Sequence, residues 1–487
     1  MESPTSSSKI YRAGTLTYTK GALAILFFWL LWGDFCFVLM ETIVPSIMPL
    51  RFKALGAPNL IMGLALVSIP AAINLVCNPI ISFRSDRYRS RWGRRIPFIF
   101  FTAPFLVLCV VGLAFSERIG PWLHAHFAVY LGQLSPEAVT IIIMTVLLIG
   151  FSFFNTFVNS VYWYLFNDVV PEHLLARFMS MFRLVSTASS SVYSLLIFKH
   201  ADTHFVEIFV GVGILYFLGF GLMCLKVKEG NYPPPPKYVD GEDGPVAAIK
   251  TYAKECMSLP HYWYVFLVNM GLIAAGATGL YGVFLQKSMG MTLEDIGELA
   301  FAGSISSAVA IVACGWLADK YHPIRVVLVG TILQTIISPI GLMWLFWHPS
   351  PHIYFCVALV LGAGLSAPVT AMVWVQDPPL FMRIFPRERY GQFCSANSMC
   401  RSVAAIIAGP LVGEYLDIMT KFYGADNAYR LMPLWSFTFH SLVLLTMIKL
   451  YRSWHSHGGD DAYAPPMIGS GGIHISDNLP DIPQPGP

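Results

Sequence analysis

The sequence predicts an all-α membrane protein in which twelve transmembrane helices form two six-helix lobes. The 487 residues are 55% hydrophobic and only 12% charged, whereas soluble proteins are about 25% charged. Twelve apolar runs fall six on each side of a polar segment with four consecutive prolines. Short signatures also recur at matching loops of the two halves. This composition excludes an ordinary soluble domain and favours a polytopic membrane protein.

The apolar runs divide the chain into five parts. The expected spans are 21–49, 59–83, 96–116, 138–165, 178–198, 204–225, 263–285, 295–318, 325–347, 352–376, 392–413 and 432–450. We therefore predict a cytoplasmic N-terminus (1–20), a first lobe (21–225), a cytoplasmic linker (226–262), a second lobe (263–452) and a disordered cytoplasmic tail (453–487). The first run is long and contains two carboxylates, so we expect a membrane span there and no cleavable signal.

A dense basic loop, SDRYRSRWGRR at 85–95, follows the second run. An arginine in hydrocarbon costs about 2.5–3.5 kcal/mol on insertion scales, so this loop must lie in water. With the N-terminus inside, 24 of the 31 lysines and arginines fall in cytoplasmic segments and 7 in outer ones. This bias predicts that both termini, the arginine loop and the linker are cytoplasmic. We expect the plasma membrane, and specifically a bacterial inner membrane.

The two halves repeat weakly at two pairs of loops. Asp319 and Lys320 after the eighth run match Asp86 and Arg87 after the second. Pro386 and Phe393 in the second half lie at one common offset from Pro171 and Phe178 in the first. Two lobes with parallel internal signatures are typical of secondary transporters that alternate by rocking.

Ionisable and amide side chains inside the spans are candidate functional residues. Asp34 and Glu41 are nearly two turns apart, on one face of the first span and about 10 Å apart along its axis. They could instead be packing or water-cavity carboxylates, and Glu41 is nearer the outer end. Asn155 and Asn159 share a face of the fourth span. They suit a neutral polyol because an amide both donates and accepts, although interhelical hydrogen bonding is the alternative.

Other patterns are uninformative or negative. The nine cysteines are scattered without a CxxC pair and are read as small buried hydrophobes. No metalloprotease, serine-hydrolase or Walker A motif is present, so we expect no enzyme, no metal and no cofactor. Tryptophans of the spans are expected mainly as interfacial anchors rather than ligand contacts. These residues are Trp29, Trp32, Trp163 and Trp374.

Asp86-Arg87 followed by Gly93-Arg94-Arg95 resembles the loop 2–3 signature of the major facilitator superfamily. The longer string SDRYRSRWGRRIPFI is similar to two narrower groups, the glycoside–pentoside–hexuronide:cation symporters and the sucrose transporters. The resemblance implies a gating role at the cytoplasmic side. The expected gating residues are Asp86, Arg87, Gly93, Arg94, Arg95, Asp319 and Lys320. Alternatively, most of the arginines only fix topology and contact anionic lipid.

The same resemblance implies a sugar site. Asp34-Phe35 resembles the sugar-binding aspartate of melibiose-type symporters, and Asn159 with Tyr162 and Leu165 resembles their helix-4 N-x-x-Y-x-x-L pattern. Arg183 lies at the place of the family's helix-5 arginine, and we expect Asp34 as its partner. Asn155 completes the predicted substrate-binding set.

The prediction of the coupling ion depends on two positions of the second expected span that carry no charge. Sodium-coupled members have two carboxylates on helix 2, and the matching positions here are the amides Asn74 and Asn78. Amides offer oxygens but no charge to offset the lost hydration of sodium. We therefore expect a proton as the coupling ion, with Asp34 favoured over Glu41 as its carrier.

The resulting functional hypothesis is a proton-coupled symporter of a sugar or glycoside, in which each lobe supplies half of a central site. The alternatives are a transporter of the same fold for an organic acid, nucleoside or drug, and a non-transporting membrane sensor or assembly protein. The expected partners are the small-molecule substrate, a proton and membrane lipid, with no nucleic acid, and we expect a monomer.

Overall fold

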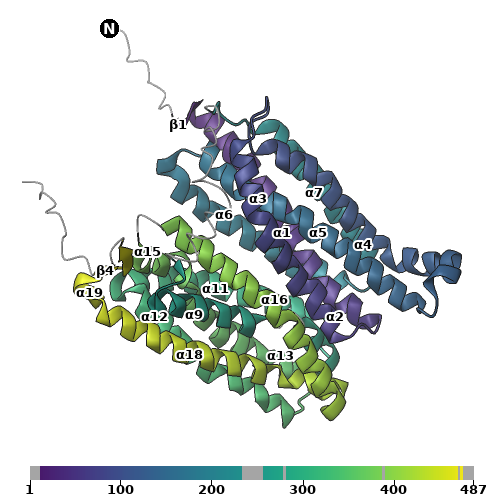
Figure 1. The fold of residues 1–487 in the computed structure, drawn as a ribbon. Coiled ribbons are helices and arrows are strands. Elements are labelled where there is room, and N and C mark those ends of the chain that lie inside the picture. The colour runs from purple at the N-terminus through teal and green to yellow at the C-terminus, as the bar shows by residue number, and fades with distance from the viewer. Residues whose placement is uncertain (1–10, 233–255, 278–280, 387–389, 470–471, 475–487) are drawn as a thin grey trace, which may run out of the picture.

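The structure, a computed structural model, describes residues 11–232, 256–277, 281–386, 390–469 and 472–474. Two helical bundles lie side by side (Figure 1), one built from the first half of the chain and one from the second. The all-α membrane fold predicted from the sequence is confirmed. Most of the predicted linker, at 233–255, and the end of the predicted tail, at 475–487, lie outside the described residues.

The first bundle contains seven α-helices and a short N-terminal hairpin of strands β1 and β2. Their bounds are β1 Tyr11–Ala13, β2 Leu16–Tyr18, α1 Lys20–Ala54, α2 Asn59–Gly63, α3 Ile69–Arg87, α4 Ile96–Leu131, α5 Pro136–Val169, α6 Glu172–Val192 and α7 Phe205–Lys226. A π-helical turn, Leu64–Ser68, joins α2 to α3, and the turns Tyr193–Ile197 and Phe198–His200 extend α6.

The second bundle contains more short pieces. Its elements are α9 Pro260–Gly276, α10 Tyr281–Val283, α11 Leu293–Tyr321, α12 Pro323–Ile337, α13 Pro351–Leu359, α14 Ala367–Trp374, α15 Phe381–Ile384, α16 Tyr390–Tyr423, α17 Ala425–Ala428, α18 Met432–Ser456, α19 Gly459–Ala462, β3 Met467–Gly469 and β4 Gly472–His474. Helical turns at Phe284–Ser288, Ser338–Leu345, Val360–Ser366, Gln376–Leu380 and Tyr429–Leu431 link or extend these helices.

Eleven helices in the described residues are long and apolar enough to cross a membrane. They correspond to eleven of the twelve predicted spans. The remaining one, predicted at 263–285, contains α9 before residues 278–280 and α10 after them, and residues 278–280 lie outside the described part of the chain.

Side-chain caps mark where several helices begin. Thr19 caps α1 by accepting from the Ala22 N–H at 3.3 Å, and a reciprocal Thr292–Asp295 capping box opens α11.

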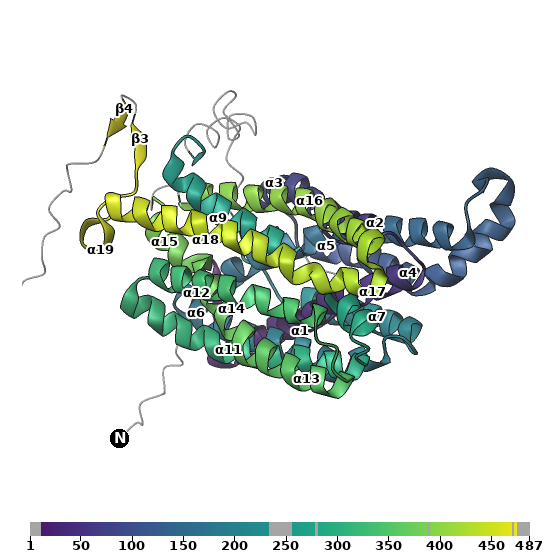
Figure 2. The ribbon, with the colours of Figure 1, turned by 90° about the horizontal axis from the view of Figure 1, so that it is seen from below.

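The predicted end of the third span is wrong, because α4 does not stop near residue 116 but continues to Leu131. The extension packs along the start of α5. A side chain at Gly120 would meet the Thr140 hydroxyl oxygen at 2.0 Å, so the helices approach closely there. Figure 2 shows this α4–α5 pair projecting beyond the neighbouring helices.

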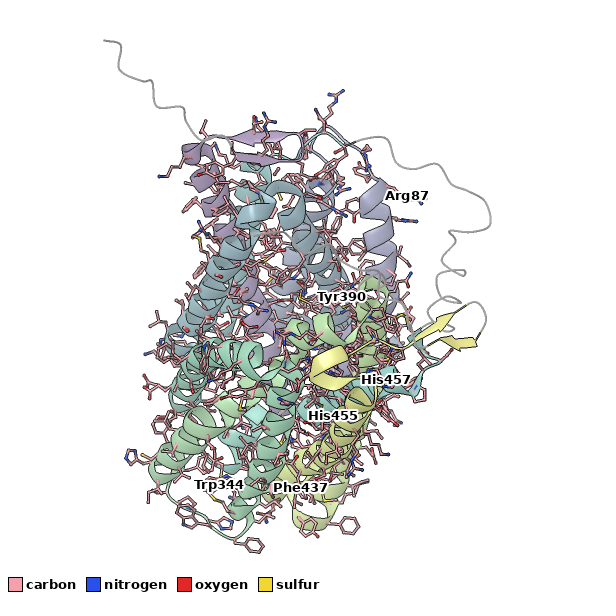
Figure 3. All side chains as sticks on the ribbon, turned by 90° about the vertical axis from the view of Figure 1, so that its left-hand side faces the viewer. Arg87, Trp344, Tyr390, Phe437, His455 and His457 are labelled. Carbon is pink, nitrogen blue, oxygen red and sulfur yellow. The ribbon has the colours of Figure 1, made fainter. Side chains whose placement is uncertain are left out.

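The two lobes touch at one end of the molecule, opposite the arginine loop. There α2 packs on the second half of α16, and the end of α6 with the turns that extend it packs on α11. Glycines allow the contact: a side chain at Gly63 would meet the Gly409 carbonyl oxygen at 2.1 Å, and one at Gly297 would meet the Ser194 carbonyl oxygen at 2.1 Å. Figure 3 shows Arg87 and Trp344 at the two opposite ends.

The start of the predicted disordered tail is ordered. The helix α18 continues to Ser456, and the Tyr463 hydroxyl donates to the Ile384 carbonyl at 2.9 Å. The Tyr262 hydroxyl donates to the Pro466 carbonyl at 2.8 Å. The buried Tyr262 and the half-buried Tyr463 hold the segment after α18 on the second lobe, and amino-acid composition alone does not predict these contacts.

Candidate functional site

A cavity of about 480 Å³ lies inside the first lobe, between α1, α3 and α5. Its polar lining includes Glu41, Asn74, Asn78, Asn155 and Asn159. All five were predicted from the sequence in three separate arguments, and they lie together in the structure. The lining residues all belong to the first lobe, although a site shared by both lobes was expected. No residue of the second lobe lines this cavity in the part of the chain that the structure describes.

Glu41 supplies the acidic side chain of this cavity. Its Oε1 accepts from Asn155 Nδ2 at 3.1 Å and from Asn159 Nδ2 at 3.3 Å. The Trp163 indole N–H donates to Asn159 Oδ1 at 3.0 Å, which fixes that amide with its NH2 toward the carboxylate. Trp163, expected mainly as an anchor, is therefore part of the cavity wall.

Two amide oxygens of this cavity have no hydrogen-bond donor within the described part of the chain. They are the Oδ1 atoms of Asn78 and Asn155, and both are buried. A buried acceptor without a donor costs free energy, about 1–3 kcal/mol in proteins. The cavity therefore favours a solute that brings hydroxyl or amine donors.

Asp34 lies outside this cavity although it is on the same helix as Glu41. Its side chain is fully buried. Oδ2 accepts from the Ser186 hydroxyl at 2.9 Å, while Oδ1 has no donor among the described residues. The expected partner, Arg183, is within electrostatic range, but among the described residues it forms no ion pair with Asp34.

Tyr162 is a packing residue in this conformation. Its hydroxyl donates to the Leu30 carbonyl at 2.5 Å, and its ring contacts Phe37, Phe166 and Phe220. These contacts hold α5 against α1. Tyr162 thus fixes the helix that carries Asn155 and Asn159 and does not line the cavity.

Arg183 is exposed on α6, and the last part of this helix contacts α11 of the second lobe. That the Arg183 side chain reaches the solute between the lobes stays a prediction.

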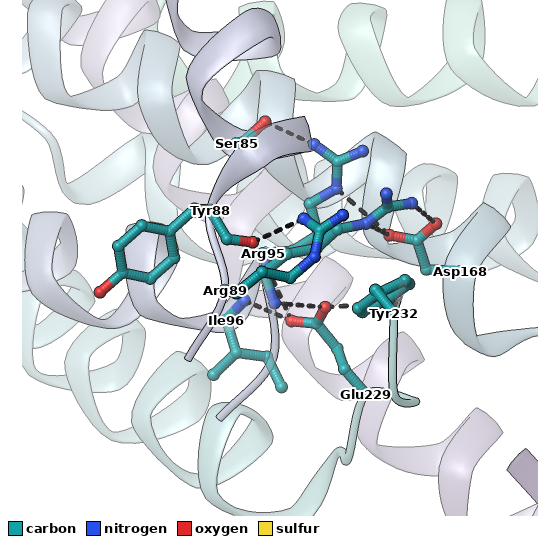
Figure 4. Close-up of polar contacts among 9 residues, drawn as sticks. Ser85, Tyr88, Arg89, Arg95, Ile96, Asp168, Glu229 and Tyr232 are labelled. Atoms are coloured by element: carbon teal, nitrogen blue, oxygen red, sulfur yellow. Dashed lines mark hydrogen bonds and ion pairs between the residues drawn. The ribbon is translucent and has the colours of Figure 1, made fainter. Parts of the chain in front are cut away.

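The arginine loop is held by an acidic residue at the end of α5 (Figure 4). Arg94 binds Asp168 through two hydrogen bonds, of 2.9 and 2.5 Å. Arg95 donates to the same carboxylate at 3.2 Å and to the Ser85 hydroxyl. The three side chains are mostly buried, so this bidentate arrangement fixes the loop more firmly than an exposed pair would.

Glu229, in the segment after α7, caps the first turn of α4. Its carboxylate accepts from the backbone N–H groups of Arg94, Arg95 and Ile96 at 2.9, 2.8 and 2.7 Å. Gly93, with φ of 104°, brings the loop against this carboxylate. An acidic group at a helix N-terminus satisfies N–H groups that the helix leaves free. The start of the linker is thereby joined to the predicted gating loop.

Tyr232 completes this cluster. Its hydroxyl donates to Glu229 at 3.1 Å, and its ring lies 4.1 Å from the Arg94 guanidinium carbon. Burial raises the pKa of the Tyr232 phenol above its usual range, so the phenol remains a donor. The residues of this cluster could not be found from short motifs, because Glu229 and Arg94 are 135 positions apart.

In the second lobe the ion pair at the matching loop is reversed, because the loop supplies the aspartate and the other helix end supplies the arginine. Asp319 lies 3.7 Å from Arg383, and Arg383 follows Asp168 at the repeat offset that relates Pro171 to Pro386. Lys320 lies over the rings of Trp316 and Tyr321, at 5.1 Å from each. Arg87 ends α3, and the side chain of Asp86 lies outside the described residues.

At the end where the lobes touch, Asp417 of α16 binds the start of α2. It accepts from the Asn59 N–H and side-chain amide at 3.2 and 2.7 Å and from the Leu60 N–H at 3.0 Å. The Tyr429 hydroxyl donates to Asn59 Oδ1 at 2.6 Å. This contact between lobes was not predicted. Its sequence signals are only an asparagine after a proline and a lone aspartate near a helix end.

Two helical bundles that touch at one end, with a polar cavity inside one of them, are typical of membrane transporters. The description "Major Facilitator Superfamily" belongs to a family model that matches residues 30–410. The chain therefore belongs to the Major Facilitator Superfamily, and it is a transporter by family. No curated protein matches it in sequence. The narrower likeness to glycoside and sucrose symporters remains a prediction.

Solved structures with the same fold include transporters with different substrates. A bacterial homologue of the iron transporter ferroportin in an inward-facing state is 14% identical, with a TM-score of 0.64 over 88% of this chain and 99% of that one. A point mutant of the nucleoside transporter NupG is 11% identical, with a TM-score of 0.62 over 88% and 100%. A D-xylose-proton symporter is 14% identical, with a TM-score of 0.58 over 88% and 97%. At these identities the likeness shows the fold alone.

Proposed function

We propose that the protein is a proton-coupled symporter of a neutral polyhydroxylated solute, a sugar or glycoside. The main support is the cavity around Glu41, where the buried oxygens of Asn78 and Asn155 lack donors among the described residues. Sugar hydroxyls can donate to these oxygens and also accept from amide NH2 groups. A cavity with several amides and one carboxylate has no excess positive charge, so an organic anion is disfavoured.

The orientation of the protein in the membrane is inferred from the distribution of lysine and arginine. The arginine loop, the hairpin of β1 and β2 and the described start of the linker, up to Tyr232, lie at one end. We assign this end to the cytoplasm because lysine and arginine are concentrated in the cytoplasmic segments predicted from the sequence. The lobes touch at the other end, so this conformation is inward-facing. Transport would then require the Asp417–Asn59 contact to break while the cytoplasmic ends close.

The proposed carrier of the proton is Asp34. Its carboxylate is fully buried and has one donor, Ser186, among the described residues. An ionised carboxylate in such a place is costly, and binding a proton removes that cost. Asp34 and Glu41 are on one helix, so protonation at one and solute binding at the other can act on the same element.

The test is solute uptake into vesicles that contain the purified protein, under an imposed pH gradient or an imposed sodium gradient. We expect the pH gradient to drive accumulation and sodium to have no effect. Sugars, nucleosides and organic anions are compared as competitors. Stimulation by sodium alone, or competition by nucleosides or anions but not sugars, would contradict this proposal.

A further inference from the structure

A second cavity, of about 580 Å³, lies in the other lobe, between the start of α9 and the end of α18. It is separate from the cavity around Glu41 and plays no part in the proposed transport step. Its walls include Pro260, His261, Lys449, Arg452, Ser453 and His457. The four α18 residues 449, 452, 453 and 456 recur every three or four positions, so they form one face of the helix, turned toward α9.

Two cations on this face lack counter-charges. Lys449 and Arg452 are exposed, and neither forms an ion pair with a carboxylate in the described part of the chain. By contrast, Arg325 pairs with Asp460 and Arg401 with Asp377 in the same lobe. Two adjacent cations that line one cavity produce a positive potential there.

The start of α9 adds to this potential. The helix begins at Pro260, and no side chain caps its first turn. The positive end of its dipole therefore faces the cavity that Lys449 and Arg452 line. Alone this feature would identify no site, but here it coincides with the two cations.

The polar wall of the cavity is ordered by hydrogen bonds. His261 uses one ring nitrogen with the Ser453 hydroxyl at 2.8 Å and the other with the Tyr463 hydroxyl at 2.9 Å. His457, at the end of α18 (Figure 3), places Nδ1 2.6 Å from the Ser453 carbonyl oxygen. A carbonyl only accepts, so Nδ1 carries the proton and Nε2 remains available to a ligand.

The position of the cavity near the ends of α9 and α18 indicates which kind of molecule carries the anionic group that binds there. The half-buried aromatic residues Trp263 and Tyr264 lie near the start of α9, and the half-buried Tyr451 lies in the last turns of α18. Aromatic residues of this kind gather where helices leave the membrane. Basic pockets between helices at this level bind phospholipid headgroups. We propose that the cavity between α9 and α18 binds the phosphate of an anionic phospholipid headgroup.

The test is lipid binding by the delipidated full-length protein in detergent, measured by native mass spectrometry during titration with phosphatidylglycerol. The variant is Lys449→Gln with Arg452→Gln. Each cation near a membrane surface contributes about 1 kcal/mol, so we expect binding about 30-fold weaker than in the wild type. Both side chains are exposed, and a thermal unfolding curve checks that the variant is folded.

Lys226→Gln is the matched control, because Lys226 is exposed in the last turn of α7, at the equivalent helix end of the first lobe. It should bind phosphatidylglycerol as the wild type does. Equal binding by the double variant, or an equal loss in the control, would overturn the proposal. A second arm titrates inorganic phosphate in place of the lipid. If the site binds phosphate but not phosphatidylglycerol, the ligand is a soluble anion and the headgroup assignment is wrong. None of these outcomes depends on the proposed sugar transport.

Discussion

Asp417 and Asn59 are separated by 358 positions, yet the Asp417 carboxylate accepts both the backbone N–H and the side-chain amide of Asn59. With the Leu60 N–H, it takes the place of an N-cap for α2, supplied by the other lobe. A helix start that is capped across the interface is satisfied only while the lobes touch. The contact therefore stabilises this conformation specifically.

The first prediction is that Asp417→Asn shifts the protein away from this conformation. The amide loses the charge that strengthens three hydrogen bonds, and bonds to charged groups contribute about 1.5–3 kcal/mol each. We expect at least a tenfold change in the ratio of the two conformations, measured by spin-label distances across the α2–α16 contact. Glu414→Gln, an exposed carboxylate one turn away, is the control. Unchanged distances in the Asp417 variant would rule out a role as a gate.

The second prediction concerns Asn159. Asn159→Ala removes a donor to Glu41 and a cavity amide, so solute binding should weaken about 10- to 100-fold while the fold persists. The control is Thr145→Val on the same helix, because the Thr145 hydroxyl bonds only the Ile141 carbonyl among the described residues. Binding is measured by thermal shift against a panel of sugars. A variant that keeps wild-type affinity would remove Asn159 from the site.

Features that depend on neighbouring residues could be predicted from the sequence, and contacts between residues far apart in the chain could not. Periodicity and loop charge predicted the helices and the arginine loop, because both are local patterns. Glu41, Asn155 and Asn159 were selected one helix at a time, and the structure joins them. The partners Asp168 and Glu229 of the arginine loop were missed because they come from the ends of other helices. No local pattern in the chain pairs residues that far apart.

The third prediction separates two arginines on α6. Arg183 is exposed on α6 and is a predicted solute contact, so Arg183→Ala should abolish solute binding without unfolding the protein. Arg177→Ala, which removes an exposed arginine nearer the start of the same helix, should leave binding unchanged. Solute counterflow in vesicles measures both. Equal loss in the two variants would indicate a general effect of charge on α6 and not a contact with solute.

The fourth prediction tests the repeated aspartates of the two loops. Asp86→Asn and Asp319→Asn should each slow transport several-fold while insertion into the membrane is unaffected. Asp319 is 87% exposed at 3.7 Å from Arg383, so its loss removes little stability, and a slower rate would reflect the conformational step. Asp460→Asn, which removes another exposed ion pair at the same end, should transport normally. Wild-type rates in both loop variants would show that these aspartates do not gate.

The last prediction identifies the proton carrier. Asp34→Asn keeps the size of the side chain and its hydrogen bond from Ser186, but it removes the group that can bind and release a proton. Accumulation of solute under a pH gradient should therefore be lost, while counterflow, which needs no net proton movement, should continue. Glu41→Gln should instead weaken solute binding, because Glu41 orients Asn155 and Asn159. Both variants are assayed in the same vesicles at equal protein content. An Asp34→Asn protein that still concentrates solute against its gradient would exclude Asp34, and loss of coupling in Glu41→Gln alone would assign the proton to Glu41.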